Sequence, residues 1–302
     1  MPVQLLTILP SAGSCAVECG NLPAVDQVTD KTATAEARIA ALDGAVVALS
    51  GGVDSSLLLA LAAHALPPGK LVAVTAVGSV ESEEDLESAR ALTGRLQVPH
   101  ECIALDSLQI PGFADNTPLR CYLCRGQLYE ALEAVRQENG FEAVLDGAIA
   151  EDKLDYRPGL QAAKEAGVLH PLAEAGFSKE EVREASRRLS LLTAERPASP
   201  CLASRFPYGE TITLEALQTV AAAEEVLHGW GFPIVRVRHH GPLARIEVPA
   251  DQIARLCGEP LRSTVAAALK ELGYAYVCVD LMGFRSGSLN EVLDLDAARW
   301  SS

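Results

Sequence analysis

The stretch "AVVALSGGVDSSLLLALAAHAL" at residues 45–66 decides the fold. Its first part, AVVAL, is a continuous apolar run typical of a buried strand, and the glycines of SGG then indicate a turn. The apolar residues that follow extend over about three turns of helix. A buried strand that leads through a glycine turn into a helix is the first unit of a parallel α/β sheet.

The alternation of strand-like and helix-like segments continues along the chain. Further buried strands are predicted at residues 70–77, 101–105 and 141–148, and helices at residues 81–97 and 124–140. Because parallel strands are joined by crossover helices, such a sheet is covered on both faces. We therefore expect a parallel-sheet α/β domain with helices on both faces.

The pattern of elements changes near residue 210. The predicted elements there are a helix at 214–229, strands at 233–240, 244–249 and 275–281, and helical segments at 251–257 and 262–272. Adjacent strands flanked by helices indicate a smaller α+β domain. The expected organisation is an extension without clear periodicity at residues 1–35, the α/β domain at 36–209 and the α+β domain at 210–302.

Composition and charge narrow the function classes. The longest apolar runs are shorter than the roughly 20 residues of a membrane span. The N-terminus has no basic segment of the secretory type, so we expect a cytoplasmic protein. With 25 basic and 40 acidic residues, the net charge of −15 argues against a grip on a nucleic-acid backbone. Small anionic substrates remain compatible with it.

The loop between the first strand and its helix has the features of a phosphate site. The candidate residues are Ser50, Gly51, Gly52, Val53, Asp54, Ser55 and Ser56. The glycines let the backbone approach an anion, and the helix N-terminus presents free N–H groups. Asp54 is expected either to hold Mg²⁺ or to cap the helix. The loop contains no lysine, which favours pyrophosphate as a leaving group over γ-phosphoryl transfer. The alternative is an ordinary serine-capped turn.

SGGVDS resembles the signature of the PP-loop ATP pyrophosphatases, which implies that ATP binds there with Mg²⁺. Four further segments resemble the LarE family, sulfur transferases that make the nickel-pincer nucleotide cofactor. They are LDGAIAEDKLDYRPGLQAAKEAGVLHPLAEAGFSKEEVREASRRLSL (145–191), SPCLASRFPYG (199–209), RVRHHGPLARIEVP (236–249) and GFRSGSLNEVL (283–293). The resemblance covers residues 36–293, and its most specific part is PCLASR with FPYG.

The LarE resemblance implies roles for individual residues. Asp152 and Arg157 fall in a loop expected at the ATP and substrate site. The resemblance implies that Arg236 and Arg238 bind phosphate, whereas the residues alone favour a solvated cross-strand ion pair with Glu247. The remaining implied residues are Arg205 and Arg285 as further phosphate ligands, and Glu224 with Glu247 as ligands of a divalent metal.

Three cysteines form the remaining candidate centre. Cys121 and Cys124 make a C-x₂-C motif, and Cys201 lies in PCLASR. Three thiolates make a poor closed zinc site, which takes four ligands, unless a residue such as His170 completes it. They suit a [4Fe–4S] cluster with one iron open, and LarE relatives with this cysteine pattern are expected to use one. In the other LarE type, the cysteine equivalent to Cys201 gives up its own sulfur. A disulfide is the fourth reading.

The implied reaction is adenylation of a pyridinium carboxylate mononucleotide followed by sulfur insertion. The resemblance also implies a homo-oligomer that acts on a small nucleotide substrate, and it leaves the sulfide source open. Competing functions are a tRNA thiolase, an ammonia-using synthetase that shares the PP-loop, and a nucleotide-binding carrier of iron–sulfur clusters. The tRNA thiolase would require a basic RNA-binding surface.

Overall fold

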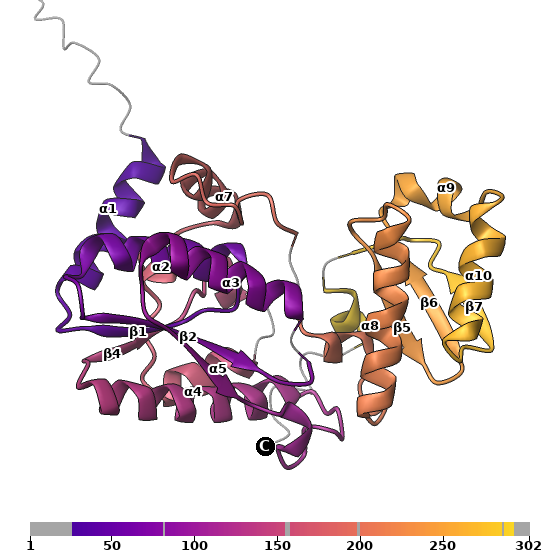
Figure 1. Ribbon diagram of the computed structural model, residues 1–302, viewed down its shortest axis with the longest axis horizontal. Coiled ribbons are helices and arrows are strands. Elements are labelled where there is room, and N and C mark those ends of the chain that lie inside the picture. The colour runs from indigo at the N-terminus through magenta and orange to yellow at the C-terminus, as the bar shows by residue number, and fades with distance from the viewer. Residues whose placement is uncertain (1–25, 81, 155–157, 198–199, 286, 293–302) are drawn as a thin grey trace, which may run out of the picture.

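The computed structural model describes residues 26–80, 82–154, 158–197, 200–285 and 287–292, and its chain forms two lobes (Figure 1). The first lobe contains α1 (Gln27–Ala40), β1 (Ala45–Ala48), α2 (Val53–Ala65), β2 (Leu71–Val77), α3 (Glu83–Leu96), β3 (His100–Ala104), η1 (Ser107–Gln109), α4 (Arg120–Asn139), β4 (Ala143–Leu145), η2 (Ala150–Leu154), α5 (Pro158–Glu165), α6 (Pro171–Glu174) and α7 (Lys179–Arg188). The second contains η3 (Leu202–Arg205), α8 (Leu214–Gly229), β5 (Arg236–His240), β6 (Leu243–Glu247), η4 (Ala250–Gln252), α9 (Ile253–Cys257), α10 (Leu261–Glu271), β7 (Tyr276–Val279) and η5 (Ser288–Val292).

The sheet of the first lobe is parallel, with strand order β3-β2-β1-β4. Alternate residues of β1 face opposite sides, as the pleat requires. Val47 packs in the core shared with α1, α2 and α7, whereas Val46 packs with α4 and α5. Helices therefore cover both faces of the sheet (Figure 1), which confirms the predicted fold class.

Strand order determines where a ligand fits in this sheet. The chain runs from β1 to β2 and β3 on one side of the sheet and then crosses from β3 to β4 on the other side of β1, so a switch point lies between β1 and β4. Open α/β sheets bind ligands beyond the carboxyl ends of their strands at such a point. The predicted phosphate loop follows β1, and the aspartate-containing segment follows β4. Both lie at this edge.

Helix α1 was not predicted from the sequence, and helix α4 begins earlier than predicted. Helix α1 starts at Gln27, inside the predicted extension, and buries Val28, Ala35 and Ile39 against α2. Helix α4 starts at Arg120 instead of residue 124, so both cysteines of C-x₂-C lie on the helix. Tertiary contacts rather than a periodic apolar face fix its first turn. The sequence pattern therefore does not reveal where the helix begins.

The second lobe is an α+β unit, as predicted. Strands β5 and β6 pair antiparallel, β7 adds in parallel to β6, and α8 and α10 bury their apolar faces against this sheet. A smaller apolar cluster joins the lobes, since Phe113 of the first packs with Phe206 and Val220 of the second. The domain boundary between residues 209 and 210 stays a prediction. Within the described residues, no helix is long and apolar enough to cross a membrane.

Candidate functional site

The loop from Ser50 to Ser55 closes tightly over the N-terminus of α2. The Ser55 hydroxyl donates to the Gly52 carbonyl at 3.1 Å and accepts from the Ser50 N–H at 3.2 Å. Gly51 has φ of +76°, and a Cβ there would lie 2.1 Å from the carbonyl oxygen of Asp85. Only glycine fits this position. The arrangement presents backbone N–H groups at a helix N-terminus, the geometry that binds phosphate.

A lysine reaches the loop from elsewhere in the chain. The Lys179 ammonium donates to both carboxylate oxygens of Asp54, at 2.8 and 2.6 Å. Lys179 is the first residue of α7, whose N-terminus is fixed by a capping box between Ser178 and Glu181. The loop itself lacks a lysine, as the sequence shows, but α7 supplies one. The capping-box pattern S-x-x-E marks the helix start, yet nothing in the sequence places that start over α2.

Acidic groups line the same edge after β4. Asp146 is buried and accepts from the Tyr129 hydroxyl at 2.7 Å and from Arg125 at 3.3 Å. Burial raises the pKa of Tyr129, which keeps the phenol protonated. A Cβ on Gly147 would lie 2.8 Å from the Ser55 nitrogen, so this segment touches the phosphate loop.

Asp152 and Arg157 are the site residues that were predicted in the segment after β4. The Asp152 carboxylate accepts from the backbone N–H of Ile149 at 3.0 Å, which closes the turn of η2. Arg157 lies outside the described residues. The structure therefore gives Asp152 a local contact and leaves its role toward a ligand a prediction.

The three predicted cysteines lie on adjoining segments. Cys121 and Cys124 are half-buried on the first turns of α4, and Cys201 is exposed immediately before η3. Cys124 and Leu202 pack against one apolar cluster that includes Ala203. In the described part of the chain, no three His, Cys, Asp or Glu side chains are arranged to hold a metal ion. The three thiols are nevertheless side chains of the type that iron–sulfur clusters take as ligands.

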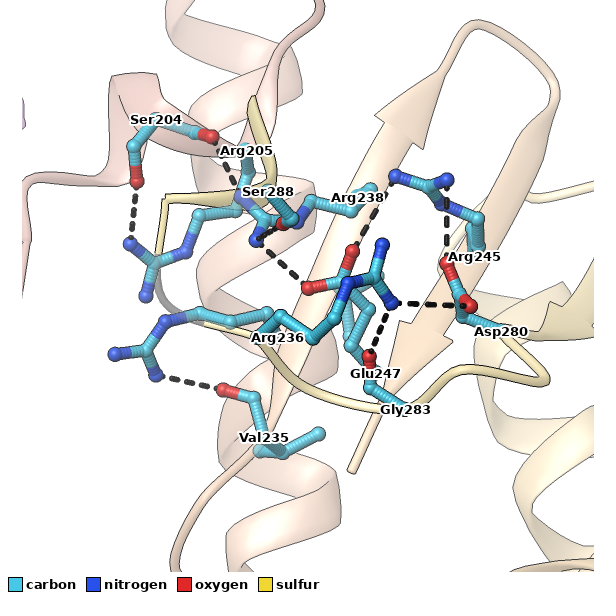
Figure 2. Close-up of polar contacts among 12 residues, drawn as sticks. Ser204, Arg205, Val235, Arg236, Arg238, Arg245, Glu247, Asp280, Gly283 and Ser288 are labelled. Atoms are coloured by element: carbon cyan, nitrogen blue, oxygen red, sulfur yellow. Dashed lines mark hydrogen bonds and ion pairs between the residues drawn. The ribbon is translucent and has the colours of Figure 1, made fainter. Parts of the chain in front are cut away.

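Buried arginines and carboxylates form a network between η3, α8 and the sheet of the second lobe (Figure 2). Arg205 forms a bidentate ion pair with Glu224, with N–O distances of 2.9 and 2.8 Å. Glu224 also accepts from the backbone N–H of Val237 at 2.8 Å. Arg238 donates to Glu247 at 2.7 Å, and Arg245 reaches the same carboxylate at 3.3 Å. Both glutamates predicted as metal ligands are thus acceptors for arginine.

Arg236 carries the most perturbed charge of this network. It is buried, donates to the carbonyl of Val235 at 2.7 Å and lies over the ring of Phe284. Burial, followed by repulsion from Arg205, lowers the pKa of Arg236 to about 10. The nearby carboxylates of Glu224 and Glu247 oppose this lowering.

Arg285 lies at the edge of the network in a more exposed position. It pairs with Glu291 at 3.0 Å, donates to the carbonyl of Gly283 at 3.2 Å and lies 3.8 Å from Asp280. The ion pair with Glu291 raises the pKa of Arg285. Arg205 has a second contact that links the network to the cysteines, because it donates to the carbonyl of Cys201 at 3.2 Å.

Known proteins are similar to this chain in sequence. The NAD synthase family model matches residues 25–112. The uncharacterized protein slr1717 of Synechocystis is 42% identical over 83% of this chain and 94% of its own length. The pyridinium-3,5-bisthiocarboxylic acid mononucleotide synthase of Lactiplantibacillus plantarum is 40% identical over 87% of this chain and 95% of its own length. With its PP-loop at the switch point of a parallel sheet, this chain therefore belongs to the LarE family of enzymes, within the PP-loop ATP pyrophosphatases.

Proposed function

We propose that this enzyme is an ATP-dependent sulfur transferase that converts a carboxylate of a pyridinium mononucleotide into a thiocarboxylate. A carboxylate oxygen attacks the α-phosphorus of ATP, pyrophosphate leaves, and an acyl-adenylate forms. A sulfur nucleophile then attacks the acyl carbon and AMP leaves. Adenylation is needed because a carboxylate has no good leaving group.

The observation that carries the proposal is the packing of the Cys201 segment against the C-x₂-C turn in a chain that also contains a PP-loop. Cys124 and Leu202 share one apolar cluster. The family model that matches residues 25–112 ends before Cys121, so it concerns the ATP-binding part alone. An ammonia-using synthetase would leave the three cysteines without a role.

Residues of the chain have assigned parts in the proposed reaction. The backbone of Ser50–Ser56 binds pyrophosphate as it leaves, with Asp54 as a ligand for the Mg²⁺ of ATP. Arg236 and Arg238 bind the phosphate of the mononucleotide, an assignment supported by their burial at alternate positions of β5, which places both on one face of the strand. Cys121, Cys124 and Cys201 would hold a [4Fe–4S] cluster, which when bound supplies an open iron for the sulfide to be transferred.

One alternative uses the same residues without a cluster. The exposed Cys201 thiolate attacks the acyl carbon of the acyl-adenylate. AMP departs, and a thioester between Cys201 and the substrate forms. Loss of the cysteine α-proton then breaks the Cβ–S bond, leaving the thiocarboxylate on the substrate and dehydroalanine in the chain. In this version, the enzyme acts once.

The test is purification without oxygen, followed by iron and acid-labile sulfide analysis and assay of pyrophosphate release. About four irons per chain, lost in Cys121→Ser and Cys124→Ser, would support the cluster. A chain without iron whose mass falls by the equivalent of H₂S after one turnover would establish the sacrificial route. Turnover with ammonia and no sulfur would refute both. The homo-oligomer and the cytoplasmic location stay predictions.

A further inference from the structure

A buried arginine lies between the two cysteine-bearing segments. Arg120 is 2% exposed and directly precedes Cys121 at the start of α4. Its Nη1 donates to the carbonyl of Ala203 at 2.9 Å and to the side-chain oxygen of Asn116. One guanidinium thus connects the C-x₂-C turn to the helix that follows Cys201, across 83 residues of sequence.

Asn116 extends this connection to the next residues. It is fully buried, and its side-chain amide donates to the carbonyls of Phe206 at 3.4 Å, Pro207 at 2.7 Å and Glu210 at 3.1 Å. Backbone bonds add to it, since the Gly209 N–H donates to the Asn116 carbonyl at 3.0 Å. The Arg120 guanidinium also lies over the ring of Tyr208 at 5.8 Å. These contacts hold residues 203–210 against the start of α4.

The energetics of Arg120 are unusual for a purely structural residue. Its described hydrogen-bond acceptors are a carbonyl and an amide oxygen, and its buried Nε has no hydrogen-bond partner among the described residues. Burying a guanidinium on neutral acceptors costs desolvation energy that a methionine of similar volume would avoid. The charge gains strong hydrogen bonds to a segment far away in the sequence. The effect of Arg120 is to fix the distance between the start of α4 and η3.

We propose that Arg120, supported by Asn116, is a positioning residue that sets the separation between Cys201 and the C-x₂-C turn. The proposal rests on the proposed function, in which the three thiols act together. Arg120 touches no reacting atom in this scheme. Without it, α4 and η3 keep their apolar packing, but the two cysteine segments lose their polar connection and sample a wider range of separations.

The experiment compares wild-type protein with Arg120→Gln and Arg120→Lys. A short bis-maleimide cross-linker is applied to the iron-free proteins, and peptide mass mapping measures the fraction of Cys201 joined to Cys121 or Cys124. The proposal expects a yield about tenfold lower in Arg120→Gln, which corresponds to the loss of one hydrogen bond to a charged group. Arg120→Lys keeps the charge and one donor, so it should recover part of the yield even if Arg120→Gln folds poorly.

Arg255→Gln is the matched control. Arg255 also donates to two backbone carbonyls, of Gly231 at 3.0 Å and Trp230 at 2.6 Å, and lies over the ring of Phe232. It lies on α9 of the second lobe, outside the segments that carry Cys121, Cys124 and Cys201. Cross-linking equal to wild type is expected for Arg255→Gln. Equal cross-linking in folded Arg120→Gln would overturn the positioning role.

Iron content separates failure of this proposal from failure of the proposed function. If wild-type protein binds iron and Arg120→Gln binds as much with unchanged cross-linking, the positioning role fails and the function stands. If wild-type protein binds no iron while cross-linking still depends on Arg120, the positioning role stands and the cluster fails. ATP-dependent pyrophosphate release should change little in Arg120→Gln, since the hydrogen bonds of Arg120 within the described residues go to Asn116 and Ala203 and not to the PP-loop.

Discussion

Lys179 and Asp54, 125 residues apart in sequence, form a two-pronged ion pair at the N-terminus of α2. Both side chains are about one-third exposed, so the pair borders the site where the phosphates of ATP are expected. Because P-loop enzymes carry a phosphate-binding lysine within their loop, we expect Lys179 of α7 to take this part. When Mg²⁺ binds the Asp54 carboxylate, the ammonium is expected to turn from Asp54 to a bound phosphate.

Replacing Lys179 with alanine should therefore weaken the use of ATP. We expect kcat/KM for pyrophosphate release to fall about tenfold to hundredfold, the loss expected for one charged hydrogen bond. Lys31→Ala is the control, because Lys31 of α1 pairs at 2.6 Å with Glu181, which lies on α7 as Lys179 does. Equal losses in both variants would show that the effect comes from α7 stability alone.

Gly51 offers a test of how tightly the loop is built. A Cβ at Gly51 meets the backbone of Asp85, whereas Gly209 has a similar φ of +83° with no atom within 4 Å of its Cβ position. Gly209→Ala should cost only the left-handed strain, about 1 kcal/mol in urea unfolding. Gly51→Ala should cost more and abolish pyrophosphate release, since the loop must move. Equal stability of the two variants would contradict the tight loop.

The sequence predicted the elements well where long apolar runs are bounded by turn residues. The strand–loop–helix unit at residues 45–66, helix 214–229 and the fold class follow from local pattern alone. The site was harder to predict from the sequence, because its contacts join segments that are far apart along the chain. Lys179 at Asp54 and Arg120 at Ala203 depend on how α7 and η3 pack, and no local pattern carries that information. The resemblance to LarE placed Arg205 and Glu224 at the site, but their direct pairing required the structure.

Glu224→Gln should destabilise the protein strongly. The change leaves the buried Arg205 without its bidentate carboxylate, and breaking such a pair costs about 3–5 kcal/mol. Urea unfolding measures the loss, with Glu259→Gln as a control that removes an exposed partner of Arg262 and should have no measurable effect. If Glu224 is a metal ligand instead, the variant will mainly shift the divalent-cation dependence of activity and leave unfolding nearly unchanged.

His100 should make stability fall in mild acid. Burial, and secondly Arg90, lowers the pKa of His100, which is hydrogen-bonded to Thr75 at 2.8 Å. In the unfolded chain, His100 takes up a proton as the pH falls through the ordinary histidine pKa of about 6.5. In the folded chain, His100 takes up the proton only at lower pH. Stability is therefore lost as pH falls below about 6.5 and is fully present above it.

Urea unfolding at several pH values between 5 and 8 tests this linkage. His100→Gln, which keeps a polar contact with Thr75, should reduce the acid slope. Part of the slope should remain, since burial lowers the pKa values of His239 and His240 as well. His64→Gln is the control, because His64 is exposed on α2. An unchanged slope in His100→Gln would rule out His100 as a source of acid sensitivity.

Arg196 should couple ATP binding to the cysteine segment. It lies in the segment that joins α7 to η3, here called the linker, which ends at Cys201. Its guanidinium donates to the carbonyl of Gly51 at 2.9 Å and pairs with Asp85 at 3.0 Å. Phosphate binding that shifts the loop will therefore shift the linker. In wild-type protein, ATP should slow alkylation of Cys201, and in Arg196→Gln this protection should shrink while KM for ATP rises.

Arg95→Gln separates this coupling from simple tethering of the linker. Arg95 donates to the carbonyls of Ser190 and Leu189, at the other end of the same linker and away from the PP-loop. Its loss should leave both KM and the ATP protection of Cys201 near wild type. If Arg95→Gln abolishes protection as Arg196→Gln does, any loosening of the linker suffices and the contact with Gly51 carries no signal. If neither variant changes protection, the PP-loop and Cys201 respond to ATP independently.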